Sequence, residues 1–523
     1  MPLFLGHNQS INETDEEHGK PIYLSDEARR LGAYVIGTTG TGKSSFLQSL
    51  ILQDVYAGHG LCVVDPHGDL VDDLLSFIPS KRVNDVILFD PSCIERPFGL
   101  NLFACDRADP RQRNLVTSGL MDTLYKLFYY SWGPRMEDLL RHSIQTLLYV
   151  PDSTFLELLL LLTDVEHRTR LKAPACEADP ILWHYWEQQW EESYLEMKAN
   201  KPTGRYKNPR GQVDLVSSSL NKIGRFLVNP VLRNIIAQPT STINFRRAMD
   251  KGQIVLINLS KGDIGSDNSS FLGSVLVNQI LLAGLTRREI PSSQRRPFHL
   301  YVDEYQNFAT ESFPQLQSEA RKFGITTTVA HQYRDQLDES NKGSTLNVAN
   351  LVVFRVSGKD GLELSGQFDN TPYESPPTYR PTMAQVDRGI FVQAQTSGSG
   401  TTLYEMMPGV REPYGDTRME TANILATLPQ YQALVRVVSS DEGKRGQLKQ
   451  YRVNTMLFGR AFNVPAQASV ASQIRQASFN MGSPVEDVEQ DIHDRVRSNV
   501  EYVSGSDYAS IVPFSVAPAD KNS

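Results

Sequence analysis

The sequence predicts an α/β protein built on a mostly parallel central sheet, and three patterns support that fold class. Short apolar runs at residues 33–36, 60–65, 85–91 and 253–259 alternate with longer segments of helical character. Some of these runs are apolar almost throughout, as expected for parallel strands that are covered on both faces. A helical stretch from about residue 107 to 239 interrupts the alternation and indicates an all-α insertion.

Four segments follow from this organisation. We expect the first part of the α/β domain at 1–106, the all-α insertion at 107–239 and the second part of the α/β domain at 240–463. A polar tail at 464–523 is expected to be partly helical or disordered, with one amphipathic helix near 484–502.

The composition is that of an ordinary soluble protein, with 40% hydrophobic and 21% charged residues. A net charge of −8 excludes a globally basic nucleic-acid binder but allows a local basic lining. The four cysteines have no metal or disulfide spacing, which favours a reducing cytosol. The most apolar run, 155–162, is far shorter than a membrane span, and the N-terminus is no signal peptide. We therefore expect membrane contact only through a partner.

The N-terminal 20 residues are polar and are expected to be loosely ordered, with a short strand after them at 21–25. The expected strand at 33–36 leads into a phosphate-binding loop pattern, G-x-x-x-x-G-K-[ST], and a helix follows the loop. Glycines allow such a loop to point several N–H groups at one anion, beside the positive end of the helix. We expect phosphate to be bound by Gly37, Thr38, Thr39, Gly40, Thr41, Gly42, Lys43, Ser44 and Ser45.

Two roles within this loop are specific. Lys43 would reach the β- and γ-phosphates of ATP, and the Ser44 hydroxyl would be a ligand of Mg²⁺. Further along the chain, two expected strands end in acids, Asp65 and Asp90. Ligands of open α/β sheets bind at the carboxyl ends of the strands, so these acids are expected near the same site.

Helices of the insertion are expected at 112–130, 134–150, 153–173 and 180–200. Trp183, Trp186 and Trp190 recur at helical spacing and fall on one face. That face could stack on nucleic-acid bases, but a helix–helix contact is the interpretation that we favour.

A basic stretch follows the tryptophans, with Lys198, Lys201, Arg205, Lys207 and Arg210, then Lys222 and Arg225. It could follow a phosphate backbone. It could equally be a solvated loop, balanced by Glu187, Glu191, Glu192 and Glu196.

The second part of the α/β domain contains a strand at 297–302 that ends in two acids, Asp303 and Glu304. In a chain that also has a phosphate loop, this pair indicates the second motif of an ATPase. Asp303 would hold the Mg²⁺ shell. Glu304 would orient and deprotonate the attacking water. Gln332, at the polar tip of the next expected strand, can hydrogen-bond both the γ-phosphate and that water.

Beyond this strand the sequence is less regular. Residues 364–400 are rich in Pro, Gly, Ser and Thr, which predicts long loops with one strand at 389–392. Runs at 432–438 and 450–453 predict an antiparallel pair at the edge of the sheet.

These motifs, in this order, resemble the HerA/FtsK branch of RecA-like motor ATPases, and within it the TraD/TraG-type conjugative coupling proteins of type IV secretion. The resemblance covers about residues 20–460, and its most specific pieces are GTTGTGKSS, LCVVDPHGD, QIVLINLSKGDIG and LYVDEYQNFATESFPQLQSEARKFGITTTVAHQ. It implies a RecA-like P-loop fold, with Lys43 and Ser44 as the Walker A pair. Asp303 and Glu304 match the Walker B pair, and Gln332 matches the sensor glutamine.

The same resemblance gives Arg321 the role of a finger that enters the site of a neighbouring subunit. It implies a homo-hexameric, Mg²⁺-ATP-driven DNA translocase, with a relaxase or type IV secretion components as further partners. Membrane-bound coupling proteins carry N-terminal transmembrane helices, and this sequence shows none. That difference admits the soluble HerA-type translocases that work with a nuclease.

Two other functions remain open on the sequence. An ATP-gated docking protein would recruit a relaxase or a secretion partner without moving anything. A protein-substrate translocase of a secretion system would be indifferent to DNA.

Overall fold

The computed structural model describes residues 2–9, 18–190, 195–198, 201–206, 209–368, 378–382, 403–407, 414–439 and 446–497. The chain divides into two compact units. The α/β unit comprises Met1–Phe89 and Asn244–Ser478, and the helical unit comprises Asp90–Ile243 and Phe479–Ser523.

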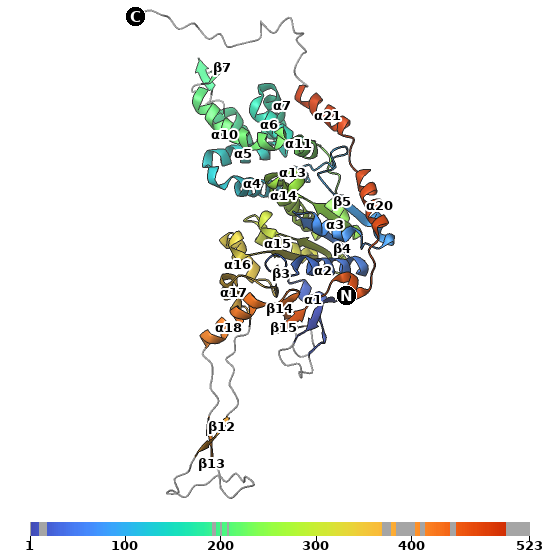
Figure 1. The fold of residues 1–523 in the computed structure, drawn as a ribbon. Coiled ribbons are helices and arrows are strands. Elements are labelled where there is room, and N and C mark those ends of the chain that lie inside the picture. The colour runs from blue at the N-terminus through green and yellow to red at the C-terminus, as the bar shows by residue number, and fades with distance from the viewer. Residues whose placement is uncertain are drawn as a thin grey trace, which may run out of the picture. The chain divides into compact units, whose positions relative to one another are not determined.

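An eleven-stranded sheet forms the centre of the α/β unit (Figure 1). Its strands are β1 (Leu3–Asn8), β2 (Pro21–Leu24), β3 (Ala33–Ile36), β4 (Gly60–Asp65), β5 (Val86–Phe89), β8 (Ile254–Asn258), β9 (Phe298–Val302), β10 (Ile325–His331), β11 (Asn350–Val353), β14 (Gln432–Val438) and β15 (Leu448–Asn454). Their spatial order is β2-β1-β15-β14-β11-β3-β10-β9-β4-β8-β5. The strands from β11 to β5 pair in parallel, whereas those from β2 to β11 pair antiparallel. The predicted mostly parallel α/β sheet is confirmed.

The parallel strands owe their apolar sequences to helices on both faces of the sheet. Every residue of β3, β4, β8, β9, β10 and β11 is buried. Their register places His331 beside Ile36 and Val302 beside Val64. The loops that follow these strands therefore emerge at one edge of the sheet, here called the carboxyl edge. The opposite border is called the amino edge.

The helices of the α/β unit are α1 (Asp26–Arg29), α2 (Lys43–Ala57), α3 (Asp69–Leu75), α12 (Phe245–Lys251), α13 (Lys261–Ile264), α14 (Ser266–Leu285), α15 (Phe313–Ala320), α16 (Glu339–Leu346), α17 (Gly358–Ser365), α18 (Tyr414–Thr427), α19 (Phe458–Phe462) and α20 (Ala468–Phe479). Short 3-10 turns connect some of them, including η6 (Tyr305–Asn307) and η7 (Arg321–Phe323). A separate pair of strands, β12 (Thr378–Thr382) and β13 (Leu403–Met407), is antiparallel. The predicted strand at 389–392 lies outside the described residues.

Among the described residues, one helical segment is long and apolar enough to cross a membrane by length and composition alone, Ser266–Glu289 with a mean hydropathy of 1.4. Buried residues make up 67% of that window. Phe271, Leu276 and Ile280 are among the side chains that α14 buries. This burial is typical of the core helix of an α/β protein.

Two expectations about the margin of the sheet are wrong. Residues 3–8 form β1, although the first 20 residues were expected to be loosely ordered. The strands β14 and β15 do pair antiparallel, but they are not at the edge, because β1 pairs with β15 and β2 pairs with β1. The polar N-terminus acquires strand structure by covering an edge that would otherwise expose unpaired backbone groups.

The helical unit contains α4 (Pro110–Phe128), α5 (Pro134–Leu147), α6 (Phe155–Thr163), α7 (Val165–Ala178), α8 (Pro180–Trp183), the π-helix η3 (His184–Trp190), α10 (Pro209–Val228), α11 (Pro230–Ile236) and α21 (Val485–Arg497). The single helix predicted at 153–173 is two helices. Asp164 separates them because its side chain accepts a hydrogen bond from the backbone of His167 at the start of α7.

The region after the tryptophans also differs from the prediction. The helix expected to reach residue 200 is described as far as Trp190, and from Leu195 the chain is a strand instead: β6 (Leu195–Lys198) pairs with β7 (Lys201–Tyr206) in the basic stretch. Trp186 and Trp190 are buried, as the favoured helix–helix interpretation requires, whereas Trp183 is 46% exposed.

Candidate functional site

The phosphate-loop pattern lies between β3 and α2, at the carboxyl edge of the sheet. Gly40 and Gly42 have φ angles of 78° and 107°, which favour glycine. A Cβ atom on Gly37 would lie 2.5 Å from the Phe354 side chain, and one on Gly42 would lie 2.7 Å from Tyr431. The glycines of the pattern are therefore required by backbone conformation and by close packing.

Neighbouring strands fix the outer side of the loop. The backbone N–H of Thr38 donates to the carbonyl of Arg355 at 2.9 Å, and the N–H of Tyr431 donates to the carbonyl of Thr41 at 2.8 Å. Within the described residues, the backbone N–H groups of residues 39–45 make no hydrogen bond. Seven successive donors at the start of a 15-residue helix form an anion-binding cradle.

Lys43 projects from the first turn of α2 to the two acids that follow β9. Its Nζ lies 2.7 Å from Glu304 Oε1 and 3.5 Å from Asp303 Oδ1, and all three side chains are buried. The backbone supports this arrangement, because the N–H of Glu304 donates to Asp303 Oδ1 at 2.9 Å. Glu304 has a φ angle of 45°, an unusual conformation for a residue with a side chain, and such conformations cluster at functional sites.

The two acids have opposite pKa shifts. Burial raises the pKa of Asp303, and the charges of Glu304 and Asp65 add to the rise, while Lys43 opposes it. Burial also disfavours the charged form of Glu304, but Lys43, Gln306 and Gln332 more than offset it, so its pKa is lowered. Glu304 is therefore held as a carboxylate, and Asp303 carries a charge that its surroundings only partly stabilise.

Gln332 joins the tip of the loop to the acids. Its Nε2 donates to Glu304 Oε1 at 3.0 Å, and its Oε1 accepts from Thr39 Oγ1 at 3.1 Å. The structure thus brings together the glutamine at the end of β10 with Lys43 and Glu304, which the motifs had selected separately. Ser44 and Ser45 lie in the first turn of α2, where Ser44 is exposed and Ser45 is half-buried.

Sequence reasoning missed Gln306, whose Nε2 donates to Glu304 Oε2 at 2.8 Å. It sits two residues after the acid, in η6, where a polar residue carries no pattern of its own. Asp65 was expected at this edge, and it is buried. Its oxygens accept from the backbone of His67 and Val71, so it shapes the loop before α3.

Asp90, the other acid expected here, follows β5, which is the last strand of the sheet. Its Oδ1 accepts hydrogen bonds from the backbone and hydroxyl of Ser92. In the sheet order β9, β4 and β8 separate it from β10, so Asp90 is not part of the group around Lys43.

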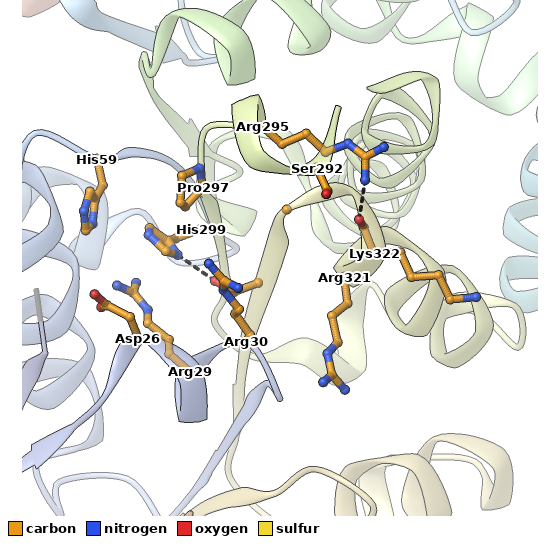
Figure 2. Close-up of a pocket in the computed structure, with 12 residues that line it drawn as sticks. Asp26, Arg29, Arg30, His59, Ser292, Arg295, Pro297, His299, Arg321 and Lys322 are labelled. Carbon is orange, nitrogen blue, oxygen red and sulfur yellow. Dashed lines mark hydrogen bonds between the residues drawn. The ribbon is translucent and has the colours of Figure 1, made fainter. Parts of the chain in front are cut away.

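Arg321 lies at the amino edge, because η7 immediately precedes β10. The seven residues of β10 separate it from the carboxyl edge, a distance of roughly 20 Å at the usual rise per residue. Arg321 is exposed and makes no side-chain hydrogen bond or ion pair with a described residue. It lines a pocket of about 220 Å³ with Arg29, Arg30, His59, His299, Arg295 and Lys322 (Figure 2).

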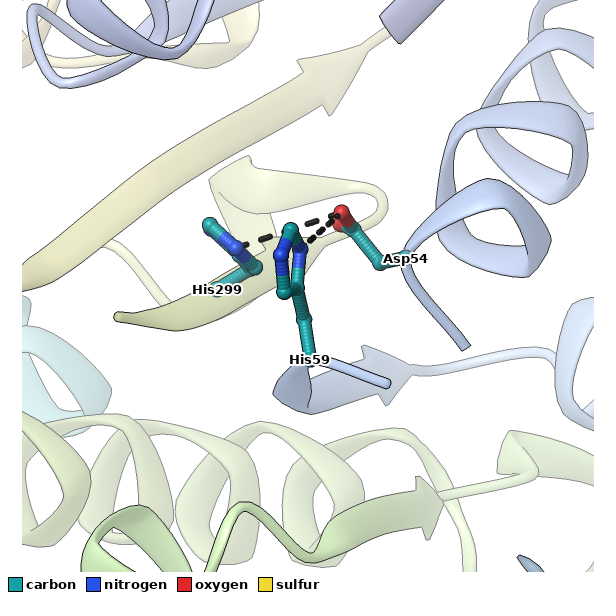
Figure 3. Close-up of side chains that lie close together, drawn as sticks. All are labelled: Asp54, His59 and His299. Carbon is teal, nitrogen blue, oxygen red and sulfur yellow. Dashed lines mark hydrogen bonds and ion pairs between the residues drawn. The ribbon is translucent and has the colours of Figure 1, made fainter. Parts of the chain in front are cut away.

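Two residues that line that pocket, His59 and His299, also belong to a largely buried cluster at the same edge. Asp54, His59 and His299 bring their ligand atoms within 4.8 Å of one another (Figure 3). Arg29, however, forms a two-pronged ion pair with both oxygens of Asp54, and the Tyr301 hydroxyl donates to Asp54 Oδ2 at 2.6 Å. A guanidinium so close would repel a metal ion, so we interpret this cluster as a self-contained ion pair.

The residues at the carboxyl edge fit a nucleoside triphosphate with a divalent cation. The loop and helix supply donors for phosphate, and Lys43 lies among them. Burial is the main cause of the raised pKa of Asp303, and Glu304 and Asp65 add to the rise against Lys43. The charged form of Asp303 is therefore incompletely stabilised, and a bound cation would stabilise it.

The sheet order and the loop together define a RecA-like P-loop fold. No protein-family model matches the chain, and no curated protein matches it in sequence. Solved structures do match its fold.

The fold is similar to that of the plasmid conjugative coupling protein TrwB. The structure of TrwB with the non-hydrolysable GTP analogue GDPNP has a TM-score of 0.53 and 17% identity, and the match covers 83% of this chain and 88% of that one. TrwB in complex with ADP and Mg²⁺ has a TM-score of 0.51 and 17% identity, over 87% and 90% of the two chains. The unbound monoclinic form of TrwB lacking 70 N-terminal residues has a TM-score of 0.51 at 17% identity, over 83% and 87%.

Proposed function

We propose that this chain is a Mg²⁺-ATP-driven DNA translocase that works as a homo-hexamer, in the manner of a conjugative coupling protein. The observation that carries the proposal is the group formed by Lys43, Asp303, Glu304 and Gln332 beside the phosphate loop. The fold shared with TrwB, which was solved with GTP and ATP analogues and with ADP and Mg²⁺, supports the nucleotide and the cation.

The chemistry assigned to each residue follows from its place. The loop N–H groups and Lys43 would hold the phosphates, and Ser44 and Asp303 would hold Mg²⁺, which would supply positive charge to the transferred phosphoryl group. Glu304, kept charged by its surroundings, accepts a proton from the attacking water. Gln332 orients that water and connects it to the loop through Thr39.

A ring is proposed because Arg321 and the phosphate loop lie far apart within one chain. Arg321 is roughly 20 Å from its own phosphate loop, so it can serve hydrolysis only in the site of a neighbour. Arg321 is exposed at the amino edge, as an intersubunit finger must be. This geometry favours a second copy of the chain as a partner.

DNA is proposed as the substrate of movement, in the cytoplasm, with recruitment to the inner face of the membrane left to a relaxase or secretion partner. The net charge of −8 requires DNA contact to be local. Lys198 at the end of β6 and Lys201 and Arg205 in β7 form one such local concentration of positive charge.

The experiment is ATP hydrolysis by the full chain with and without DNA, with Lys43→Ala as the inactive control. A DNA motor should hydrolyse ATP several-fold faster with DNA, and the stimulation should fall steeply with added salt. Stimulation by a relaxase instead of DNA would replace the motor with an ATP-gated docking protein. Activity indifferent to DNA and salt would favour a protein translocase. A nuclease-dependent DNA response would favour the HerA-type alternative.

A further inference from the structure

Different side chains lie on the two flanks of the phosphate loop. On the β10 side of β3 lie Glu304 and Gln332, which mark the end of the site where the γ-phosphate would be cleaved. On the other side lie β11 and β14. Because β14 is antiparallel to β11, its first residue lies at the carboxyl edge, and Tyr431 directly precedes it.

Tyr431 is held against the loop in an unusual backbone conformation. Its φ angle is 62°. Its N–H donates to Thr41, and its carbonyl accepts from both the N–H of Thr455 at 2.8 Å and the Thr455 hydroxyl at 2.9 Å. Glycine would adopt this conformation without strain, so the tyrosine is kept in place by its surroundings rather than by its own preference.

Two residues with this kind of backbone conformation lie beside the loop. Four residues other than glycine have positive φ angles in the described part of the chain: Asp152, Glu304, Tyr431 and Asn463. Glu304 belongs to the group around Lys43, and Tyr431 contacts the loop from the opposite flank. Strained residues that surround a functional site point to a role for their side chains.

The side chain of Tyr431 lies directly beside Gly42. A Cβ atom at Gly42 would lie 2.7 Å from Tyr431 Cδ1, so only glycine allows the ring this close. Tyr431 is half-buried, so part of the residue stays accessible to solvent. Glu304 and Gln332 mark the γ-phosphate end on the opposite flank, so the rest of a bound nucleotide would extend from the loop on the side of the Tyr431 ring.

We propose that the Tyr431 ring stacks on the base of the nucleotide whose phosphates the loop holds. The inference rests on the proposed nucleotide site and adds a base-binding residue to it. Stacking uses the π-face that every base has, so Tyr431 distinguishes a nucleotide from bare polyphosphate and does little to separate adenine from guanine.

The experiment compares the affinity of the full chain for ATP with its affinity for inorganic tripolyphosphate, by calorimetry in Mg²⁺. Tyr431→Gly removes the ring and suits the positive φ, so folding is preserved. ATP affinity should fall about tenfold, and tripolyphosphate affinity should stay unchanged. Tyr431→Phe should retain wild-type affinity for both, because the ring remains.

Two controls separate the possible failures. Asn463→Gly relieves a similar backbone conformation away from the loop, and it should change neither affinity. Lys43→Ala should weaken both ligands, because it removes a phosphate contact. If Tyr431→Gly weakens both ligands equally, or neither, the stacking inference is wrong while the nucleotide site stands. If the wild-type chain binds neither ligand, the proposed function fails and the inference fails with it.

Discussion

Each edge of the central sheet buries carboxylate charge, but only at the amino edge is that charge matched by neighbouring groups. At the amino edge, Asp54 is bound by Arg29 and Tyr301 and receives a hydrogen bond from His59. Burial alone would raise the pKa of Asp54, but His299, Arg29 and the hydrogen bonds lower it far below its ordinary value. The negative charge there is fully matched.

At the carboxyl edge, one ammonium serves two acids. Lys43 is nearest to Glu304, and the pKa of Asp303 is raised because burial and two other carboxylates outweigh Lys43. The contrast teaches that burial of charge does not by itself identify a site. A charge that the protein leaves unbalanced is the better sign of a place where a ligand completes the structure.

The largest expected effect is the loss of ATP hydrolysis when either edge is mutated, and its recovery when the two variants are mixed. Lys43→Ala removes the phosphate contact at the carboxyl edge, and Arg321→Ala removes the finger at the amino edge. Each variant should lose hydrolysis by about 10³-fold or more. If the edges meet between neighbours, mixed rings of the two variants should regain activity, because a Lys43→Ala subunit supplies Arg321 to an intact phosphate loop.

The measurement is the ATPase rate of each variant and of a mixture assembled from both. Lys322→Ala, which removes the adjacent exposed lysine, is the matched control and should stay close to wild type. Nucleotide binding by Arg321→Ala should be intact. A mixture as inactive as its components, or an Arg321→Ala variant with normal turnover, would show that Arg321 is not an intersubunit finger.

A smaller effect concerns the free energy of unfolding, which should change in opposite directions when the buried acid at each edge is neutralised. Asp54→Asn leaves Arg29 charged and buried, and the free energy of unfolding should fall by about 3 kcal/mol. Asp303→Asn removes a carboxylate whose charged form is disfavoured, because its pKa is raised in the folded protein. That variant should be as stable as wild type or up to about 1 kcal/mol more stable, although hydrolysis is lost.

Denaturant unfolding of both variants checks this difference, with Asp85→Asn as a control. Asp85 pairs with Arg82 but is 51% exposed, so its loss should cost at most about 1 kcal/mol. Equal destabilisation by Asp54→Asn and Asp303→Asn would contradict the division of the sheet into a balanced and an unbalanced edge.

The sequence could predict those parts of the site that short contiguous motifs encode, and it could not predict contacts between distant segments. The phosphate loop and the paired acids are contiguous motifs, so the meeting of Lys43 with Asp303 and Glu304 was predictable, while their catalytic roles stay predictions. Tyr431 was not predictable, because its contact with Gly42 depends on how β14 is placed next to β11. No local pattern encodes a pairing across such a sequence distance.

The fold shows the same limit. The apolar parallel strands were predicted because their burial leaves a signal in each short segment. The strand β1 was missed because it pairs with β15, some 440 residues later, and its sequence has no clear alternation. The break at Asp164 was missed because an apolar run continues the helical pattern on one side of a capping side chain.

The smallest expected effect is on the pH dependence of the free energy of unfolding, because each edge buries a neutral histidine. At the amino edge, His299 Nδ1 contacts Thr326 Oγ1 at 2.6 Å, and at the carboxyl edge His331 contacts the Tyr34 hydroxyl. Burial lowers the pKa of each to about 3, against about 6.5 in an unfolded chain. Between these values the unfolded chain binds protons that the folded chain excludes.

The stability that these histidines provide is therefore complete above pH 6.5 and is lost as the pH falls toward 3. Each should contribute a slope of up to about 1.4 kcal/mol per pH unit to the free energy of unfolding. His299→Asn and His331→Asn should each reduce the slope by that amount, whereas the exposed His184→Asn should leave it unchanged. An unaltered slope in either buried variant would mean that the histidine at that edge accepts a proton in the folded state, so that edge would carry a further positive charge.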